Sequence, residues 1–182
     1  VTLHPEHISC YGLKLEPGTR MYKEYYDSPI LPDDDEQADM YSYAAEMLER
    51  YGYKQYEISN FAAPGYESKH NLKYWNMDDY MSFGPGAHSS VGNLRYSFVK
   101  DLKQYIYGVH KKISIIDEYE QIDPLERAVE YVMLGMRTSR GISEYDYRTK
   151  CQCDFKPIQK VLEAFREKGW VEKTENRWHL VR

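Results

Sequence analysis

The 182 residues, 21.6 kDa in all, are 42% hydrophobic and 29% charged, which is the composition of a soluble globular protein with a real core. A net charge of −5 and an isoelectric point of about 5.7 argue against a general attraction to nucleic acid or to anionic membranes. No apolar run reaches the length of a membrane span, and three cysteines give no disulfide framework, so we expect a reducing compartment, the cytoplasm.

The first predicted element is a strand over residues 7–13. A domain rarely starts on a central strand, so we expect the chain to be the C-terminal piece of something larger. Asp33–Glu36 offer a helix N-cap and a negative first turn, and apolar residues then recur at helical spacing, which predicts a helix over residues 34–51. The same acidic run could also be interpreted as a cation site, but a solvated helix start explains it without a ligand. A strand over residues 55–59 follows, and such strand–helix–strand units build parallel sheets or barrels with ligand sites at the carboxyl ends of the strands.

The stretch from Tyr56 to Ser89 is the strongest candidate for a functional site. After its strand we expect an irregular segment, with Pro64-Gly65 as a turn. Long loops are uncommon unless they are functional or disordered, and the aromatic content of this one argues against disorder. Its most informative side chains are His70, Asn71, Tyr74 and Trp75. An imidazole can bind a metal or a haem iron and flat rings can stack on a macrocycle, although lone histidines are more often structural.

Other candidate residues give weaker signals. Gly84-Pro85-Gly86 either lets the backbone approach a ligand or turns the chain. His88 can be interpreted as a metal ligand, as a buried histidine or as a strand-end residue. The last two interpretations are simpler than metal binding. Cys151 and Cys153 resemble half of a zinc site, but zinc needs four ligands, so we interpret both as structural or incidental. Cys10 is most simply a small buried hydrophobe.

The second half of the chain is predicted to begin with a strand over residues 93–98 and a helix over residues 99–108. A polar, irregular segment follows, and we place a domain boundary in it near Asp117, which gives domains of residues 1–116 and 117–182. Beyond the boundary, helices are expected over residues 124–137, 143–148 and 157–168, and a hairpin over residues 170–181. Three helices and a hairpin is the order of a winged helix.

A winged helix raises the hypothesis of DNA binding. From Asp117 onward there are 12 basic and 13 acidic residues. Sequence-independent affinity for DNA needs a cluster of cations, and this segment has none that stands out. A packing or lid module is the better interpretation, with no nucleic acid as partner.

Five segments carry a family resemblance: ISCYGL, LPDDDEQADMY, YEISNFA, PGYESKHNLKYW and FGPGAHS. Together they resemble the oxygen-independent coproporphyrinogen III oxidase-like proteins of the radical S-adenosylmethionine family, and within it the HemW-type haem chaperones. The resemblance covers nearly the whole chain. It implies an α/β (α+β) fold: the C-terminal part of a partial (β/α) radical SAM barrel, followed by a winged-helix-like HemN C-terminal domain.

The motif that discriminates within this family is His70-Asn71-x-x-Tyr74-Trp75. True coproporphyrinogen oxidases lack it, and in HemW-like proteins its histidine is the implied haem ligand. The resemblance therefore implies a haem-binding site of His70, Asn71, Tyr74 and Trp75, with His70 as the ligand of the iron. It also puts Gly12, Gly84 and Gly86 at the border of the S-adenosylmethionine cavity, and it implies no catalytic residue in this chain.

The chain departs from the family in its cysteines. The family carries Cys-x-x-x-Cys-x-x-Cys, which holds a [4Fe–4S] cluster that binds S-adenosylmethionine, and Cys10, Cys151 and Cys153 do not fit that spacing. Cluster and cofactor are thus expected only in a full-length parent, and the chain should be inactive alone.

The partners implied are haem or a porphyrin, haem-acceptor proteins, and a transient membrane contact of the parent. An open barrel edge would favour self-association. The alternative functions are a part of an oxygen-independent coproporphyrinogen III oxidase and, third, a winged-helix DNA binder.

Overall fold

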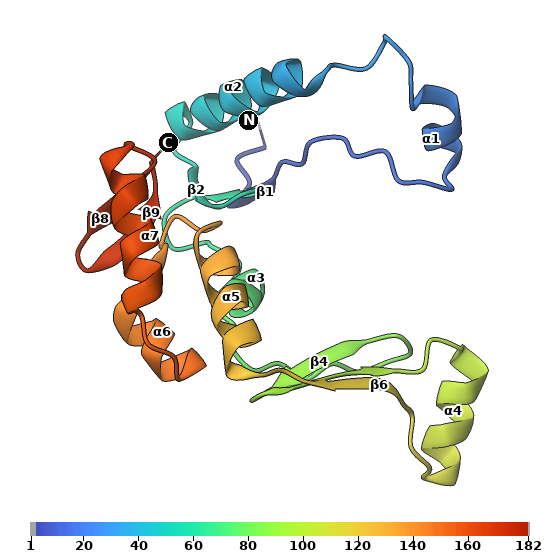
Figure 1. The fold of residues 1–182 in the computed structure, drawn as a ribbon. Coiled ribbons are helices and arrows are strands. Elements are labelled where there is room, and N and C mark those ends of the chain that lie inside the picture. Colours follow the sequence, from blue (N-terminus) through green and yellow to red (C-terminus); the bar gives the residue numbers. More distant parts are fainter. Residues whose placement is uncertain (1–2, 182) are drawn as a thin grey trace. The chain divides into compact units, whose positions relative to one another are not determined.

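The structure is a computed structural model that describes residues 3–181 (Figure 1). Helices and strands are mixed along the chain, which confirms the predicted fold class. The chain divides into two compact units between Ser68 and Lys69. Within the part that the structure describes, none of the helices combines the length and the apolarity that crossing a bilayer requires.

The first unit contains a small three-stranded sheet. Its elements are β1 (His7–Ser9), α1 (Arg20–Tyr25), α2 (Asp34–Arg50), β2 (Lys54–Glu57) and β3 (Asn60–Ala62). The strand order is β1-β3-β2, and β3 is antiparallel to both neighbours. β1 and β2 therefore run in the same direction, as a strand–helix–strand unit predicts. The difference is β3, which lies between them and was expected to be irregular.

The helix predicted from the acidic run is present as α2. Asp33 and Glu36 form a reciprocal capping box, in which the Asp33 carboxylate accepts from the Glu36 N–H at 2.9 Å and the Glu36 carboxylate accepts from the Asp33 N–H at 3.1 Å. Helix initiation thus accounts for these acids. Residues 3–181 contain no group of three or more His, Cys, Asp and Glu side chains that could hold a metal ion.

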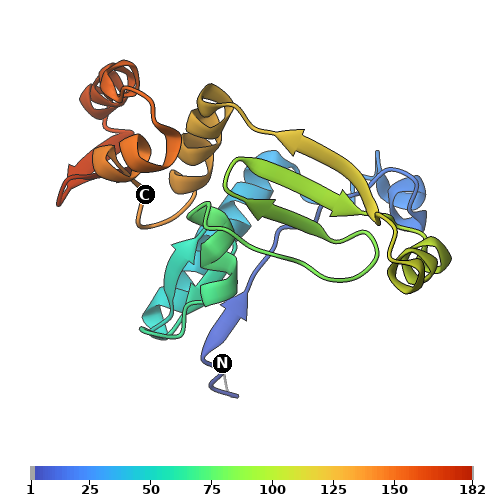
Figure 2. The same ribbon diagram turned by 90° about the horizontal axis from the view of Figure 1, so that it is seen from below.

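The second unit begins with a helix and a meander of three strands. These are α3 (Lys69–Trp75), β4 (His88–Val91), β5 (Leu94–Phe98), α4 (Leu102–Lys111) and β6 (Ile116–Gln121). Figure 2 shows β4, β5 and β6 side by side with α4 at one end, and all the pairings are antiparallel.

Two of these elements correct the predictions. Residues 69–75 are the helix α3 rather than a loop, and the polar segment after α4 contains the strand β6 rather than irregular chain. Every residue of β6 is exposed, because the strand lies at the edge of its sheet and takes its order from backbone pairing with β5. Such a strand needs no apolar alternation, so the sequence gives no signal for it.

The last part of the chain is a winged helix, as predicted. Its elements are α5 (Pro124–Gly135), β7 (Ile142–Ser143), α6 (Glu144–Cys151), α7 (Lys156–Glu167), β8 (Val171–Thr174) and β9 (Arg177–Leu180). The sheet order is β7-β9-β8. Asp123 is the N-cap of α5, and its carboxylate accepts hydrogen bonds from the N–H groups of Leu125 and Glu126.

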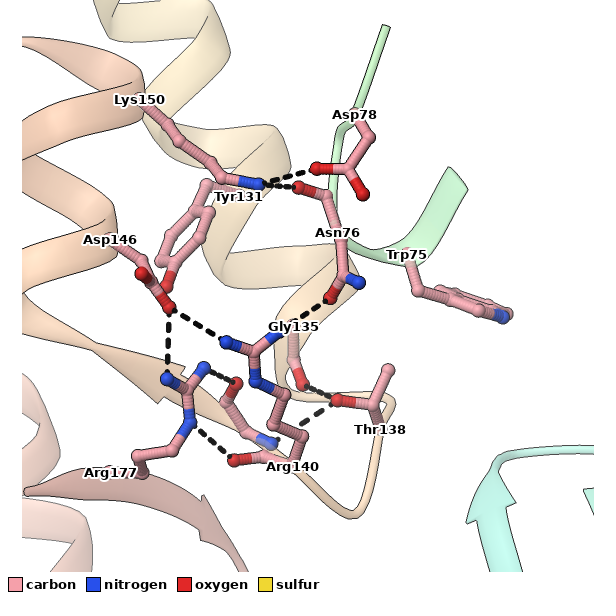
Figure 3. A pocket seen from close by; sticks show the side chains of 11 residues that line it. Trp75, Asn76, Asp78, Tyr131, Gly135, Thr138, Arg140, Asp146, Lys150 and Arg177 are labelled. Carbon is pink, nitrogen blue, oxygen red and sulfur yellow. Dashed lines mark hydrogen bonds and ion pairs between the residues drawn. The ribbon is translucent and has the colours of Figure 1, made fainter. Parts of the chain in front are cut away.

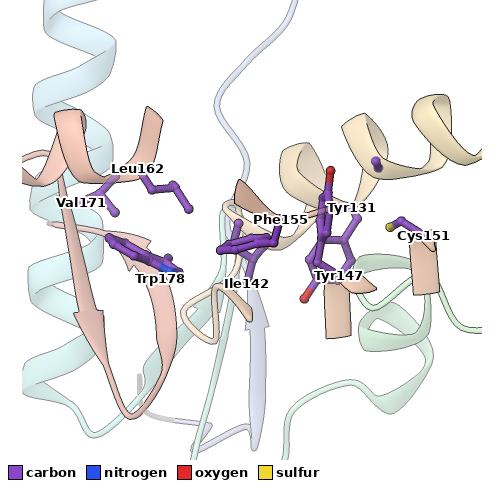
Figure 4. Packing of buried hydrophobic residues seen from close by; sticks show 9 residues of the cluster. Tyr131, Ile142, Tyr147, Cys151, Phe155, Leu162, Val171 and Trp178 are labelled. Carbon is purple, nitrogen blue, oxygen red and sulfur yellow. The ribbon is translucent and has the colours of Figure 1, made fainter. Parts of the chain in front are cut away.

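One apolar cluster holds the winged helix together (Figure 4). Its members are Ala128, Tyr131, Ile142, Tyr147, Cys151, Phe155, Leu162, Val171 and Trp178. The aromatic members meet edge-on, with ring centroids 5.8 Å apart for Tyr131 and Tyr147 and 5.2 Å apart for Tyr147 and Phe155. The cluster includes Cys151, which confirms a structural role for this cysteine.

Gly141 allows the α5–β7 connection to pass close to β9. Its φ is +65°, and a Cβ there would meet the carbonyl oxygen of Trp178 at 2.0 Å. We predict that Gly141→Ala lowers the free energy of unfolding by about 2–5 kcal/mol, the sum of a left-handed backbone penalty and a steric clash. Urea denaturation of the chain, followed by circular dichroism, measures this loss.

Gly169 provides the matched control, because its φ of +74° is similar and a Cβ there meets nothing within 4 Å. Gly169→Ala should cost only the backbone penalty, about 1–2 kcal/mol. Equal losses in the two variants would contradict the close approach of Gly141 to Trp178.

Candidate functional site

The helix α3 carries the whole His70-to-Trp75 motif. His70 and Tyr74 lie four residues apart, so they share one face of the helix. The Tyr74 hydroxyl lies 2.9 Å from Nε2 of His70, and the two rings meet edge-on with centroids 5.0 Å apart. Tyr80 continues this row, with its ring 4.7 Å from that of Tyr74. The imidazole therefore stands at the edge of a small aromatic group.

His70 itself is exposed, and Asn71 and Trp75 are half-buried. An accessible imidazole can give a ring-nitrogen lone pair to a metal. Coordination through Nε2 would require the bond with Tyr74 to open, whereas coordination through Nδ1 would leave Tyr74 in place as the partner that orients the ring. The residues present therefore fit the axial ligation of an iron porphyrin.

The C-terminal end of α3 is tied to the winged helix (Figure 3). The Lys150 ammonium group donates to the carbonyl oxygen of Asn76 and lies 3.0 Å from the carboxylate of Asp78. Arg140 donates to the side-chain oxygen of Asn76 at 3.2 Å. Two cations of the winged helix thus hold the residues that directly follow the motif.

A cavity of about 240 Å³ opens at this junction. Its lining comes from the end of α3, from α5 and the α5–β7 connection, from α6 and from β9: Trp75, Asn76, Asp78, Tyr131, Gly135, Thr138, Arg140, Gly141, Asp146, Lys150 and Arg177. In Figure 3 the Asn76 side chain points toward Arg140, while the indole of Trp75 extends away from the cations. The cavity is therefore mostly polar, with two aromatic residues, Trp75 and Tyr131, in its lining.

Asp146 and Arg177 form the centre of the cavity's polar network. Arg177 donates to the Asp146 carboxylate at 2.9 Å and to the carbonyl oxygens of Arg140 and Gly141, each at 2.9 Å. Burial alone would raise the pKa of Asp146, but hydrogen bonds with Arg177 and Ser143 and the charges of Arg177 and Arg140 hold it below the ordinary value. Asp146 is thus ionised and structurally engaged.

The predicted glycines lie in turns or in extended chain. Gly12 is exposed in the first unit. Gly84 and Gly86 lie in the second unit and have φ values of +107° and +69°. The Gly84 N–H donates to the Tyr105 hydroxyl at 3.2 Å, and the Gly86 N–H donates to the carbonyl oxygen of Val99 at 3.1 Å. Their positive φ values explain why glycine stands there, and a role beside S-adenosylmethionine stays a prediction.

His88 is the exposed first residue of β4, which agrees with its interpretation as a strand-end residue. The cysteines do not fit an iron–sulfur cluster. Burial raises the pKa of the Cys151 thiol to about 11, and this thiol donates to the carbonyl oxygen of Arg127 at 3.6 Å. Cys153 donates to the carbonyl oxygen of Pro124 at 3.4 Å. Both thiols are therefore engaged within the winged helix.

The cations around Asn76 could not be recognised from the sequence. Arg140, Lys150 and Arg177 come from a connection, a helix and a strand. Isolated cations at such spacings look like ordinary surface residues, and only the packing of the winged helix brings them together.

Comparison with known proteins shows which families the chain is similar to. The profile of the HemN C-terminal domain family matches residues 122–182. The heme chaperone HemW of Bacillus subtilis is 34% identical over the whole chain, and the match covers 48% of that protein. The heme chaperone HemW of Escherichia coli is 43% identical over 50% of the chain and 23% of its own length. The chain spans about half the length of the curated relatives that it matches along its entire length.

A solved structure has the same fold. Coproporphyrinogen III oxidase (HemN) from Escherichia coli, described as a radical SAM enzyme, superposes with a TM-score of 0.72 over 99% of this chain and 45% of its own. The sequence identity is 16%, so this likeness concerns the fold alone.

The charge of Asp146 should be measurable in the stability of the fold. We predict that Asp146→Asn lowers the free energy of unfolding at pH 7 by about 1.5–3 kcal/mol, because it removes the charged acceptor of Arg177. The pKa of Asp146 lies below its ordinary value of 3.8, so the ionised form stabilises the fold above that pH. The stabilisation is lost as the pH falls below 3.8 through the folded-state pKa, and the difference between wild type and variant should shrink there.

Urea denaturation at pH 7 and near pH 3 measures that difference. Asp117→Asn, a change on the exposed strand β6, is the control and should have little effect at either pH. A loss in Asp146→Asn of equal size at both pH values would rule out the charge as its cause.

Proposed function

We infer that this chain, whose residues 122–182 belong to the HemN C-terminal domain family and whose whole length is similar to heme chaperone HemW proteins, is the haem-binding portion of a haem chaperone. The haem is cargo, which the full-length protein would pass to acceptor proteins. His70 is the proposed ligand of the iron, and Asn71, Tyr74 and Trp75 are proposed to complete the site. The observation that carries the proposal is the exposed imidazole of His70 beside Tyr74.

The chemistry of these side chains supports that role. A neutral imidazole is a common axial ligand of haem iron. Tyr74 fixes the orientation of the imidazole through its hydroxyl, and its ring adds apolar surface beside it. Haem would supply an iron with an open axial position and a flat apolar macrocycle, which suits an aromatic neighbourhood.

We propose that a full-length protein would also hold a [4Fe–4S] cluster and S-adenosylmethionine, in the part that this chain does not include. Cys10, Cys151 and Cys153 lack the family spacing, and Cys151 and Cys153 donate to backbone carbonyls of the winged helix. We therefore propose that this chain does no radical chemistry alone. Gly12, Gly84 and Gly86 remain our candidates for the border of the cofactor cavity.

A second candidate function is supported by the likeness in fold to coproporphyrinogen III oxidase. In that case the chain would form part of a porphyrinogen pocket, and the full-length protein would decarboxylate coproporphyrinogen III. Assay of that reaction in the full-length protein separates the two functions, because a chaperone should show no turnover.

Haemin titration of the chain tests the role of His70. The wild type should shift the Soret band of haemin, and we expect His70→Ala to abolish the shift and to weaken binding by at least about tenfold, or 1.4 kcal/mol. His110→Ala is the matched control, because His110 is also an exposed histidine near a helix end and should leave the titration unchanged. A Soret shift that survives in His70→Ala would remove His70 from the mechanism.

Tyr74→Phe extends this test to the choice of ring nitrogen. Removal of the hydroxyl should raise the affinity for haemin if Tyr74 competes with the iron for Nε2, and should lower it if Tyr74 orients the ring for coordination through Nδ1. An unchanged affinity would mean that the hydrogen bond between Tyr74 and His70 has no part in binding.

A further inference from the structure

The cavity beside α3 contains more positive than negative side chains. The cations that line it are Arg140, Lys150 and Arg177, and the carboxylates are Asp78 and Asp146. The three cations all come from the winged helix, in which acidic residues slightly outnumber basic ones from Asp117 onward. The cavity therefore favours an anionic ligand.

Each of the three cations has an ion-pair partner, and the pairs of Arg177 and Lys150 are the closer ones. Arg177 lies 2.9 Å from Asp146 and directs its other donors to two backbone carbonyls, so its role is structural. Lys150 lies 3.0 Å from Asp78 and also donates to the carbonyl oxygen of Asn76.

Arg140 carries the excess charge. Its nearest carboxylate is that of Asp146 at 3.5 Å, and Asp146 is already engaged more closely by Arg177. The other terminal nitrogen of Arg140 donates to the neutral side-chain oxygen of Asn76 at 3.2 Å. The Arg140 side chain is 54% exposed, so a ligand can reach it without unfolding the domain. A planar guanidinium group suits a carboxylate, which it can bind through two parallel hydrogen bonds.

We propose that this cavity binds a carboxylate through Arg140, with Lys150 as a supporting cation, and, on the basis of the proposed function, that the carboxylate is a propionate of the bound porphyrin. Trp75 connects the proposed iron-binding motif with the proposed carboxylate site, because it belongs to the motif and also lines the cavity. His70 and Trp75 are five residues apart in α3, which is a rise of about 8 Å along the helix axis and a turn of about 140° around it. A porphyrin ligated by His70 would therefore have to extend along the helix and around its side to bring a propionate to Arg140.

Metal-free protoporphyrin IX tests the carboxylate site without any contribution from iron ligation. We compare its binding to the chain with that of its dimethyl ester, in the same dilute detergent, by the fluorescence anisotropy of the porphyrin. The wild type should prefer the diacid by about tenfold. Arg140→Ala should weaken binding of the diacid about tenfold and leave the ester within twofold, and Arg140→Lys should fall between wild type and Arg140→Ala.

Arg137→Ala is the matched control, because Arg137 is an exposed arginine that follows the same helix and does not line the cavity. It should bind both porphyrins as the wild type does. Three outcomes would overturn the proposal: no preference for the diacid in the wild type, an equal loss of diacid and ester in Arg140→Ala, or no binding of either porphyrin.

Together with the haemin titration, this experiment distinguishes a failure of the carboxylate site from a failure of His70 as the iron ligand. If Arg140→Ala loses the preference for the diacid while the Soret shift proves independent of His70, the carboxylate site stands and the axial ligand is wrong. If His70→Ala abolishes the Soret shift while Arg140→Ala binds both porphyrins normally, the axial ligand stands and the carboxylate site is wrong.

Discussion

The position of the proposed haem-binding motif depends on how Asn76 is held. The helix that carries the motif, α3, is seven residues long and buries none of them. A helix of this length is marginal in water, so its order must come from tertiary contacts. Lys150 and Arg140 supply such contacts, one at the backbone carbonyl and one at the side chain of Asn76. The winged helix therefore determines where the end of the motif lies, although it contributes no residue to the motif itself.

The bonds of Lys150 to the end of the motif are well positioned because buried groups hold the backbone of Lys150. Arg127, itself buried, donates to the carbonyl oxygen of Lys150 at 2.9 Å and to that of Gly92 in the β4–β5 turn at 2.7 Å. One guanidinium group thus connects the end of α6 to the strands that follow the motif. Cys151, next to Lys150, is packed in the apolar cluster of the winged helix. A surface ion pair alone contributes little to stability, but the bonds of Lys150 start from a backbone that the core has already ordered.

The sequence predicts the elements whose order is local and misses those whose order is imposed by neighbours. The helices α2 and α5 begin at capping boxes that can be read directly from Asp33 and Asp123. α3 and β6 have no comparable signal, since the first is held by distant cations and the second by pairing at a sheet edge. The same distinction holds for the site. His70 stands out through a contiguous motif, whereas Arg140, Lys150 and Arg177 are scattered along the chain, and only the folded winged helix brings them to one cavity.

The two parts of the proposed site differ in a way that suits a protein that passes its cargo on. The cations lie in a network anchored by the core, in which Asp146 and Arg177 are fixed by several hydrogen bonds. The imidazole of His70, in contrast, is exposed and is oriented by a side-chain hydrogen bond with Tyr74 of the same short helix. Local opening costs least where few buried contacts are lost, so the proposed ligation by His70 could be broken while the cation network stays intact. A site built in this way would keep hold of the edge of a porphyrin while its iron changes ligand, which is the order of events that direct transfer to an acceptor requires.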